Sequence, residues 1–151
     1  MTAIYHLFPA TIHPMVVHFT IAIIYLAGLF GLIGLIRRKD SFWVKAFVLT
    51  LVLGILATIA AGVAGVISES YDKIPPAVQP ILNAHKRDGE LTGVTVVIAL
   101  FVQLIHTRMR KVSWIAYVFC VIAVILVSIT GHLGGTMVYN HGLGVLGITR
   151  K

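Results

Sequence analysis

Seven histidines are the side chains of this chain most able to do chemistry, and two of them open the first strongly apolar run, IHPMVVHF at residues 12–19. Imidazole binds haem iron, zinc and copper, and it exchanges protons near neutral pH. An ionisable side chain inside an apolar helix is costly and usually serves a site. The candidates are His6, His13, His18, His85, His106, His132 and His141.

The spacing of the histidines limits which of them can share a ligand. His13 and His18 are five residues apart, about 140° around a helix of 3.6 residues per turn, so they face different neighbours. His18 lies roughly 6 Å below Pro14 at a rise of about 1.5 Å per residue. His85 stands roughly 9 Å above the third apolar run. His132 follows the last apolar run and reaches a level similar to that of His18.

The composition indicates which elements position these side chains. Hydrophobic residues make up 58% of the 151 residues and charged residues only 11%, which excludes a soluble core. A spanning helix needs about 20 mostly apolar residues, and four segments qualify: residues 14–36, 46–67, 88–107 and 114–131. The expected fold is all-α, a single domain over residues 1–151 that forms an integral membrane four-helix up-and-down bundle. We expect the third helix to begin outside the bilayer near Pro80, and the fourth span to end in a glycine-rich outer segment after residue 131.

The basic residues predict the orientation in the membrane. They follow the first and third spans: Arg37, Arg38, Lys39, Lys45, Arg108, Arg110 and Lys111. The positive-inside rule places these loops in the cytoplasm and both termini outside, in a multi-pass protein of the plasma (inner) membrane. The net charge of +7 then reflects membrane sidedness, and no nucleic-acid partner is expected. Six of the histidines lie in the outer half, and His106 lies at the inner end.

A haem site is the expected use of these outer histidines. Cofactors of helix bundles bind in the core between facing helices. Diagonal helices lie roughly 13 Å apart when neighbours pack about 8–10 Å apart, which suits histidine ligands on opposite sides of a haem iron. Spans one and three are diagonal, so His18 and His85 are the expected axial ligands. Asp88 is expected to orient His85, and the haem propionates to face Lys86 or Arg87.

The remaining outer histidines, His13, His132 and His141, are expected to form a second haem or metal site, or a quinone-binding set. A helix cap or a carbonyl partner explains His13 equally well, and the headgroup layer explains His6 and His106. The flanking residues of spans one and three do not indicate an internal repeat. Five glycines can leave room for a cofactor, or simply let helices pack closely: Gly62, Gly65, Gly131, Gly134 and Gly135.

Two segments, IHPMVVHFTIAI and GHLGGTMVYNHGLGV, resemble the end motifs of a bacterial and archaeal membrane family known as domain of unknown function 2231. A histidine ahead of the third span, as at His85, also fits that family, whereas Thr20 stands where members often have proline. The resemblance implies a four-helix membrane domain. Such domains are sometimes found near or fused to Rieske or cytochrome modules, which implies redox work.

These features predict a haem-b-binding membrane electron-transfer subunit, without catalysis of its own, that links the quinone pool to an extracytoplasmic redox partner. One or two haem b groups are expected as cofactors, with a quinone as a further ligand. The expected partners are other membrane subunits of a larger respiratory oxidoreductase assembly, an extracytoplasmic redox protein and the lipid bilayer. Two alternatives stay open: a cofactor-free membrane anchor subunit, and a copper- or zinc-binding membrane protein. The single cysteine, Cys120, excludes a disulfide and a paired-cysteine metal motif.

Overall fold

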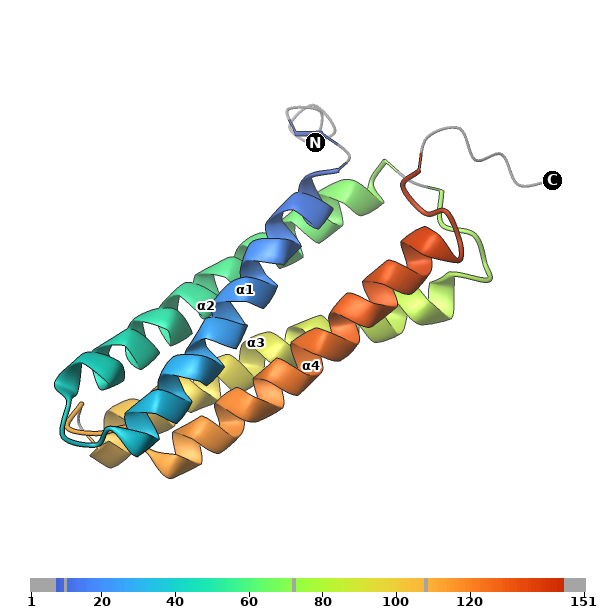
Figure 1. Ribbon diagram of the computed structural model, residues 1–151. Helices are drawn as coiled ribbons and strands as arrows, with labels where there is room; N and C mark the ends of the chain where they lie inside the picture. The colour runs from blue at the N-terminus through green and yellow to red at the C-terminus, as the bar shows by residue number, and fades with distance from the viewer. Residues whose placement is uncertain (1–7, 10, 72, 108, 146–151) are drawn as a thin grey trace.

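Four long helices form an up-and-down bundle (Figure 1). The computed structural model describes residues 8–9, 11–71, 73–107 and 109–145. Its helices are α1 (Ile12–Ile36), α2 (Ser41–Glu69), α3 (Gln79–Thr107) and α4 (Trp114–Tyr139), and each is long and apolar enough to span a membrane. Both α1 and α3 pack against α2 and α4, which places α1 and α3 on one diagonal. The predicted all-α membrane fold is confirmed.

The helices continue past the apolar spans at one end of the bundle. α3 begins at Gln79, as predicted, and α4 continues past the expected span, through the glycine-rich segment, to Tyr139. A Cβ on Gly134 would lie 3.4 Å from His85 Cε1. This glycine therefore serves close packing of α4 on α3 and does not end the helix.

Two ends of the bundle differ in chemistry. We call the end with the loops 37–40 and 109–113 the basic end, and the opposite end, where α1 and α3 begin, the histidine end. Asp40 caps α2 by accepting from the backbone N–H of Phe42 at 2.9 Å. Two residues named from the sequence, His6 and Arg108, lie outside the described residues.

Small side chains bring the helices together through the middle of the bundle. The buried core mixes alanines with a few large residues, among them Ile24, Phe47 and Leu51. Large apolar side chains cover the outer surface, as lipid requires. Because lipid tails are as apolar as the core, close packing of small residues supplies most of the attraction between membrane helices.

A separate cap closes the histidine end. Gly142 has a positive φ of 62° just after α4, and its N–H donates to the Val138 carbonyl at 2.8 Å. This turn brings Leu143 onto a small apolar cluster that includes Leu82 and Met137. The cap and the main core are therefore separate, and the polar groups of the histidine end lie between them.

Gln103 holds the loop at the basic end, and its loss is expected to weaken the fold. Its side chain is fully buried; Nε2 donates to Thr107 Oγ1 at 2.7 Å and to the Lys111 carbonyl at 2.9 Å, and Oε1 accepts from Ser113 N–H at 2.8 Å. Gln103→Leu leaves the buried Ser113 N–H and the part-buried Lys111 carbonyl unpaired, at about 1–3 kcal/mol for a buried group. We expect the free energy of unfolding in detergent to fall by about 2–4 kcal/mol.

Gln79→Leu is the matched control for that loss. Gln79 is exposed and donates to Asn83 Oδ1 at 3.0 Å, one turn along its own helix. Its replacement should change the free energy of unfolding by less than about 0.5 kcal/mol. Equal effects of the two substitutions would contradict the role assigned to Gln103.

Candidate functional site

His13 lies in the first turn of α1 and is fixed by α2. Its backbone N–H donates to Ser68 Oγ at 3.3 Å, and its Nδ1–H donates to the Ala61 carbonyl at 2.9 Å. The first N–H groups of a helix lack partners within that helix, so the Ser68 hydroxyl satisfies one of them. The α1–α2 hairpin therefore sets the position of this imidazole by itself.

His85 lies in the second turn of α3 and is fixed by α4 in the same way. Its Nδ1–H donates to the Thr130 carbonyl at 2.9 Å, and the residue is only 9% exposed. Because a carbonyl can only accept, Nδ1 carries the proton in both rings and Nε2 carries the lone pair. Metal-binding histidines are usually held in this manner, with the other ring nitrogen bound to a carbonyl or carboxylate.

A glycine beside each carbonyl lets the imidazole reach it. A helix carbonyl points toward the residue four positions later, and Gly65 and Gly134 occupy those positions. A Cβ on Gly65 would lie 3.3 Å from His13 Nδ1, as close as the Gly134 Cβ would come to His85. Side chains at these positions would displace the rings, so two of the glycines expected to make room lie directly against the histidines.

The two imidazoles meet between the hairpins, and we call them the histidine pair. Their ring centroids are 5.7 Å apart and their planes are 80° apart. His13 and His85 come from diagonal helices, so they approach each other from opposite sides of the bundle. Within the described part of the chain, neither Nε2 has a hydrogen-bond partner. One ligand between the hairpins can therefore use both lone pairs.

A mostly apolar cavity of about 560 Å³ adjoins the histidine pair. This volume falls within the range of about 300–1,000 Å³ that is usual for cofactor and small-molecule sites. All four helices line it, and Ile74 and Leu143 close it from the cap. Gly62 also lines it, and a Cβ there would meet nothing within 4 Å. The cavity therefore offers an apolar space with two nitrogen ligands at one side.

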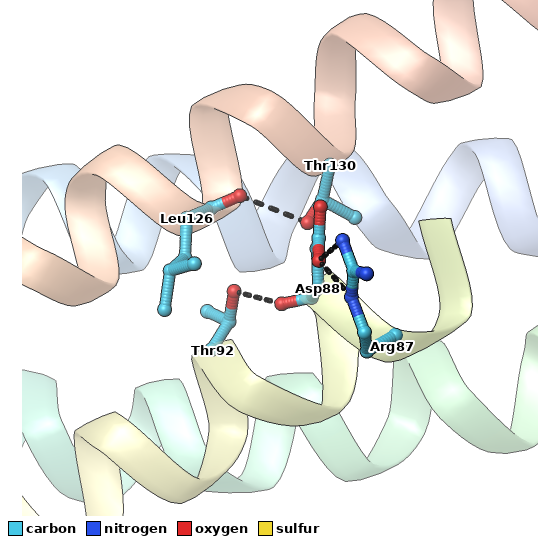
Figure 2. A network of polar contacts seen from close by, with 5 residues as sticks. All are labelled: Arg87, Asp88, Thr92, Leu126 and Thr130. Carbon is cyan, nitrogen blue, oxygen red and sulfur yellow. Dashed lines mark hydrogen bonds and ion pairs between the residues drawn. The ribbon is translucent and has the colours of Figure 1, made fainter. Parts of the chain in front are cut away.

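Two ion pairs lie near this cavity, and they differ in position. Lys86 Nζ lies 2.6 Å from Glu69 Oε2, and both residues line the cavity. Arg87 instead donates through Nε to Asp88 Oδ1 at 2.8 Å (Figure 2). The buried Asp88 thus binds Arg87 and does not orient His85, whose ring is held by a backbone carbonyl.

The structure does not bring the other predicted ligands to this place. His18 is exposed, and its Nδ1–H donates to the Pro14 carbonyl of its own helix. His13, rather than His18, is therefore beside His85. His132 is exposed on α4, and His141 is half-buried in the turn that follows. Across the described ranges, no group of three His, Cys, Asp or Glu side chains is arranged to hold a metal ion.

His106 lies far from the histidine pair, and the carbonyl partners of the pair were not predicted from the sequence. His106 lies at the basic end, where its Nδ1 is 2.8 Å from Ser113 Oγ. Sequence reasoning missed the Ala61 and Thr130 carbonyls, because any residue supplies a carbonyl. The sequence did carry one signal: Thr20 follows His13 at the same spacing as Thr92 follows His85. It indicates that the two histidines occupy equivalent levels.

Comparison with known proteins agrees with a membrane protein. Neither the curated proteins nor the solved structures include a match to this chain. A family model with the description "predicted membrane protein (DUF2231)" matches residues 9–147, which covers the four helices and the histidine pair. The chain therefore belongs to the DUF2231 family of predicted membrane proteins.

Proposed function

We propose that the chain is a membrane electron-transfer subunit that binds one haem b in this cavity, with His13 and His85 as axial ligands. The observation that carries the proposal is the histidine pair itself: two imidazoles from diagonal helices, each with its Nδ1–H on a backbone carbonyl and a free Nε2 lone pair. Axial histidines must approach a haem iron from opposite sides, and diagonal helices satisfy that requirement.

The distance between the rings fits two ligands on one metal ion. Metal–nitrogen bonds of about 2 Å on each side place imidazole centroids roughly 6 Å apart when the three atoms are in line. The observed separation is 5.7 Å. The apolar lining supports the same proposal, since a dry, low-dielectric site sets the potential of a haem iron.

The chain's own residues would orient the ligands and exclude water. The Ala61 and Thr130 carbonyls hold the two rings in one tautomer and raise the basicity of Nε2. Leu82, Met137 and Leu143 cover the cavity from the cap. Haem b, when bound, would supply reversible one-electron transfer.

The proposal extends to sidedness and partners. The basic loops favour a cytoplasmic basic end, so the histidine pair would lie near the outer face of the plasma membrane. A site at one face alone suits exchange between the quinone pool and an extracytoplasmic redox protein, within a larger respiratory assembly. The exposed His132 and half-buried His141 lie on the same end and are available to such a partner.

The alternatives have less support from the geometry. A structural zinc site is normally completed by four protein ligands, and the histidine pair supplies two, with no third metal-ligand side chain grouped with it in the described ranges. A cofactor-free anchor gives no reason for two imidazoles with free Nε2 atoms that line an apolar cavity. Both alternatives nevertheless make distinct predictions for the purified protein.

The deciding experiment is the dithionite-reduced minus oxidised visible spectrum of the purified membrane protein, with a pyridine haemochrome assay and metal analysis. We expect sharp b-type bands and about one haem per chain. A colourless protein without iron, purified under conditions that retain haem in a control cytochrome, would falsify the proposal. Copper or zinc in that sample would favour the metal-binding alternative, and no metal at all would favour the anchor.

A further inference from the structure

The two helical hairpins repeat one arrangement, although their sequences look unrelated. Residues of α1 match residues of α3 that come 72 positions later, and all the matched residues beyond the histidines are buried. Thr92 donates to the Asp88 carbonyl of its own helix at 2.7 Å, and Thr20 donates to the matching Val16 carbonyl at 3.5 Å and to the Ala57 carbonyl of α2 at 3.0 Å. The matched pairs are His13 and His85, Thr20 and Thr92, Ile24 and Val96, and Ala27 and Ala99.

The second helix of each hairpin repeats in the same manner. Here the matched residues are 69 positions apart. The carbonyl that binds the imidazole and the glycine beside it recur, as does the buried small residue near the middle of the helix. The matched pairs are Gly54 and Ala123, Ala61 and Thr130, Gly62 and Gly131, and Gly65 and Gly134.

The repeat is broken on one side of the bundle only. Gly89 and Gly93 of α3 stand where α1 has Val17 and Ile21. Ile21 covers the α1–α4 side, where a Cβ on Gly131 would lie 3.5 Å from its Cδ1. On the α2–α3 side the matching residue, Gly93, packs against Thr58 and covers nothing beyond it, so Gly62 has no neighbour within 4 Å of a Cβ. The cavity accordingly extends past Gly89 to the α2–α3 side.

This side of the cavity reaches the outer surface of the bundle between α2 and α3, and we call it the α2–α3 opening. Ile59 and Val66 line the cavity and are also 60% and 59% exposed. In a membrane these side chains would face lipid. The Lys86–Glu69 ion pair lies on the same two helices, with side chains 44% and 33% exposed. The opening is therefore mostly apolar, with Lys86 and two carboxylates, Glu69 and Glu90, along it.

We infer that the ligand of the histidine pair enters and leaves sideways through the α2–α3 opening, and that Lys86 at its edge binds a carboxylate of that ligand. This inference rests on the proposed function, because haem b is an apolar ring with two carboxylates along one edge. Arg87 is excluded from this role, since it does not line the cavity and is bound to Asp88. Glu69 holds Lys86 until a ligand carboxylate replaces it.

Matched cysteines test the opening. Gly62→Cys and Gly131→Cys place the same side chain at equivalent positions of the two hairpins, and the native Cys120 is buried. In haem-free protein in detergent, N-ethylmaleimide should label the Gly62→Cys thiol at least about tenfold faster, because labelling follows exposure. The labelled Gly62→Cys protein should no longer take up added haemin, and Gly131→Cys should take it up as the wild type does.

The outcomes separate this inference from the proposed function. Equal labelling of the two cysteines would overturn the α2–α3 opening, whether or not the protein binds haem. Normal haemin uptake by the labelled Gly62→Cys protein would overturn its use as the entrance. If unmodified wild-type protein takes up no haemin, the proposed function fails, and with it the ligand assigned to the opening.

Two charge variants test the carboxylate contact. Lys86→Gln should weaken haemin binding roughly fivefold, the effect of one partly exposed ion pair. Arg87→Gln removes the same charge one residue away and should leave haemin binding unchanged. If both variants weaken haemin binding equally, net charge and not a specific contact explains the effect. If Lys86→Gln does not weaken haemin binding, Lys86 does not bind the ligand carboxylate.

Discussion

Replacing His13 or His85 with alanine is expected to abolish stable haem b binding. Each substitution removes one Nε2 and leaves a single nitrogen ligand on one side of the cavity. Outer partners of metal ligands are alone worth about 10–100-fold in affinity, so loss of a ligand should reduce haem content at least about tenfold. The measurement is the haem-to-protein ratio of purified variants, with the reduced minus oxidised spectrum of whatever haem remains.

His18→Ala is the matched control on the same helix. His18 is exposed and binds only the Pro14 carbonyl of its own helix, so its variant should keep the wild-type haem content and spectrum. Adding imidazole to His13→Ala should restore a six-coordinate spectrum, because alanine leaves space for a free imidazole beside the cavity. A colourless His18→Ala protein next to a normal His13→Ala protein would show that His18 is the ligand.

The fold was largely predictable because the membrane simplifies the problem. Four apolar runs with short basic loops permit few arrangements, and all backbone groups in lipid must pair within helices. The length of α4 was not predictable from apolarity. Its last two turns are glycine-rich, and Gly134 in them packs against His85, a residue 49 positions earlier in the chain.

The sequence predicted that a histidine of α1 would lie near His85, but it did not predict correctly which one. The diagonal helices with level ends bring a histidine of α1 to His85, and it is His13 in place of the expected His18. The depth estimate favoured His18, because it measured from the apolar run. α1 and α3 both begin above that run, so His13 is the residue level with His85. The direction of His18 depended on which face of α1 packs inward, which neighbouring helices decide.

The carbonyl partners and the α2–α3 opening were beyond sequence reasoning for a different reason. Both depend on residues that lack a side chain. Gly65 and Gly134 act by exposing a carbonyl, and Gly89 acts by leaving space where α1 has Val17. In a sequence such glycines cannot be told from those that only allow close helix packing. The structure separates the two kinds by what a Cβ would meet.

The second large effect is expected from replacing a tightly packed glycine, Gly31, with leucine, and Gly62→Leu is the comparison. A Cβ on Gly31 would lie 2.8 Å from Tyr117 Cδ2 and 2.9 Å from Phe47 Cε2, in a closely packed part of the core. Overpacking of this kind costs about 1–3 kcal/mol and occasionally more. Since leucine adds three further carbons, we expect Gly31→Leu to lower the free energy of unfolding by about 3 kcal/mol or more.

Gly62→Leu introduces the same side chain into open space, so it should leave the unfolding free energy within about 1 kcal/mol of wild type. It should nevertheless prevent haem binding, because leucine would fill part of the cavity. Thermal and SDS unfolding in detergent, beside the haem-to-protein ratio, measure both effects. The pair therefore separates stability from ligand binding: Gly31→Leu should lose both, and Gly62→Leu should lose only the ligand. Stable haem binding by Gly62→Leu would mean that the cavity beside the histidine pair is not where the haem is held.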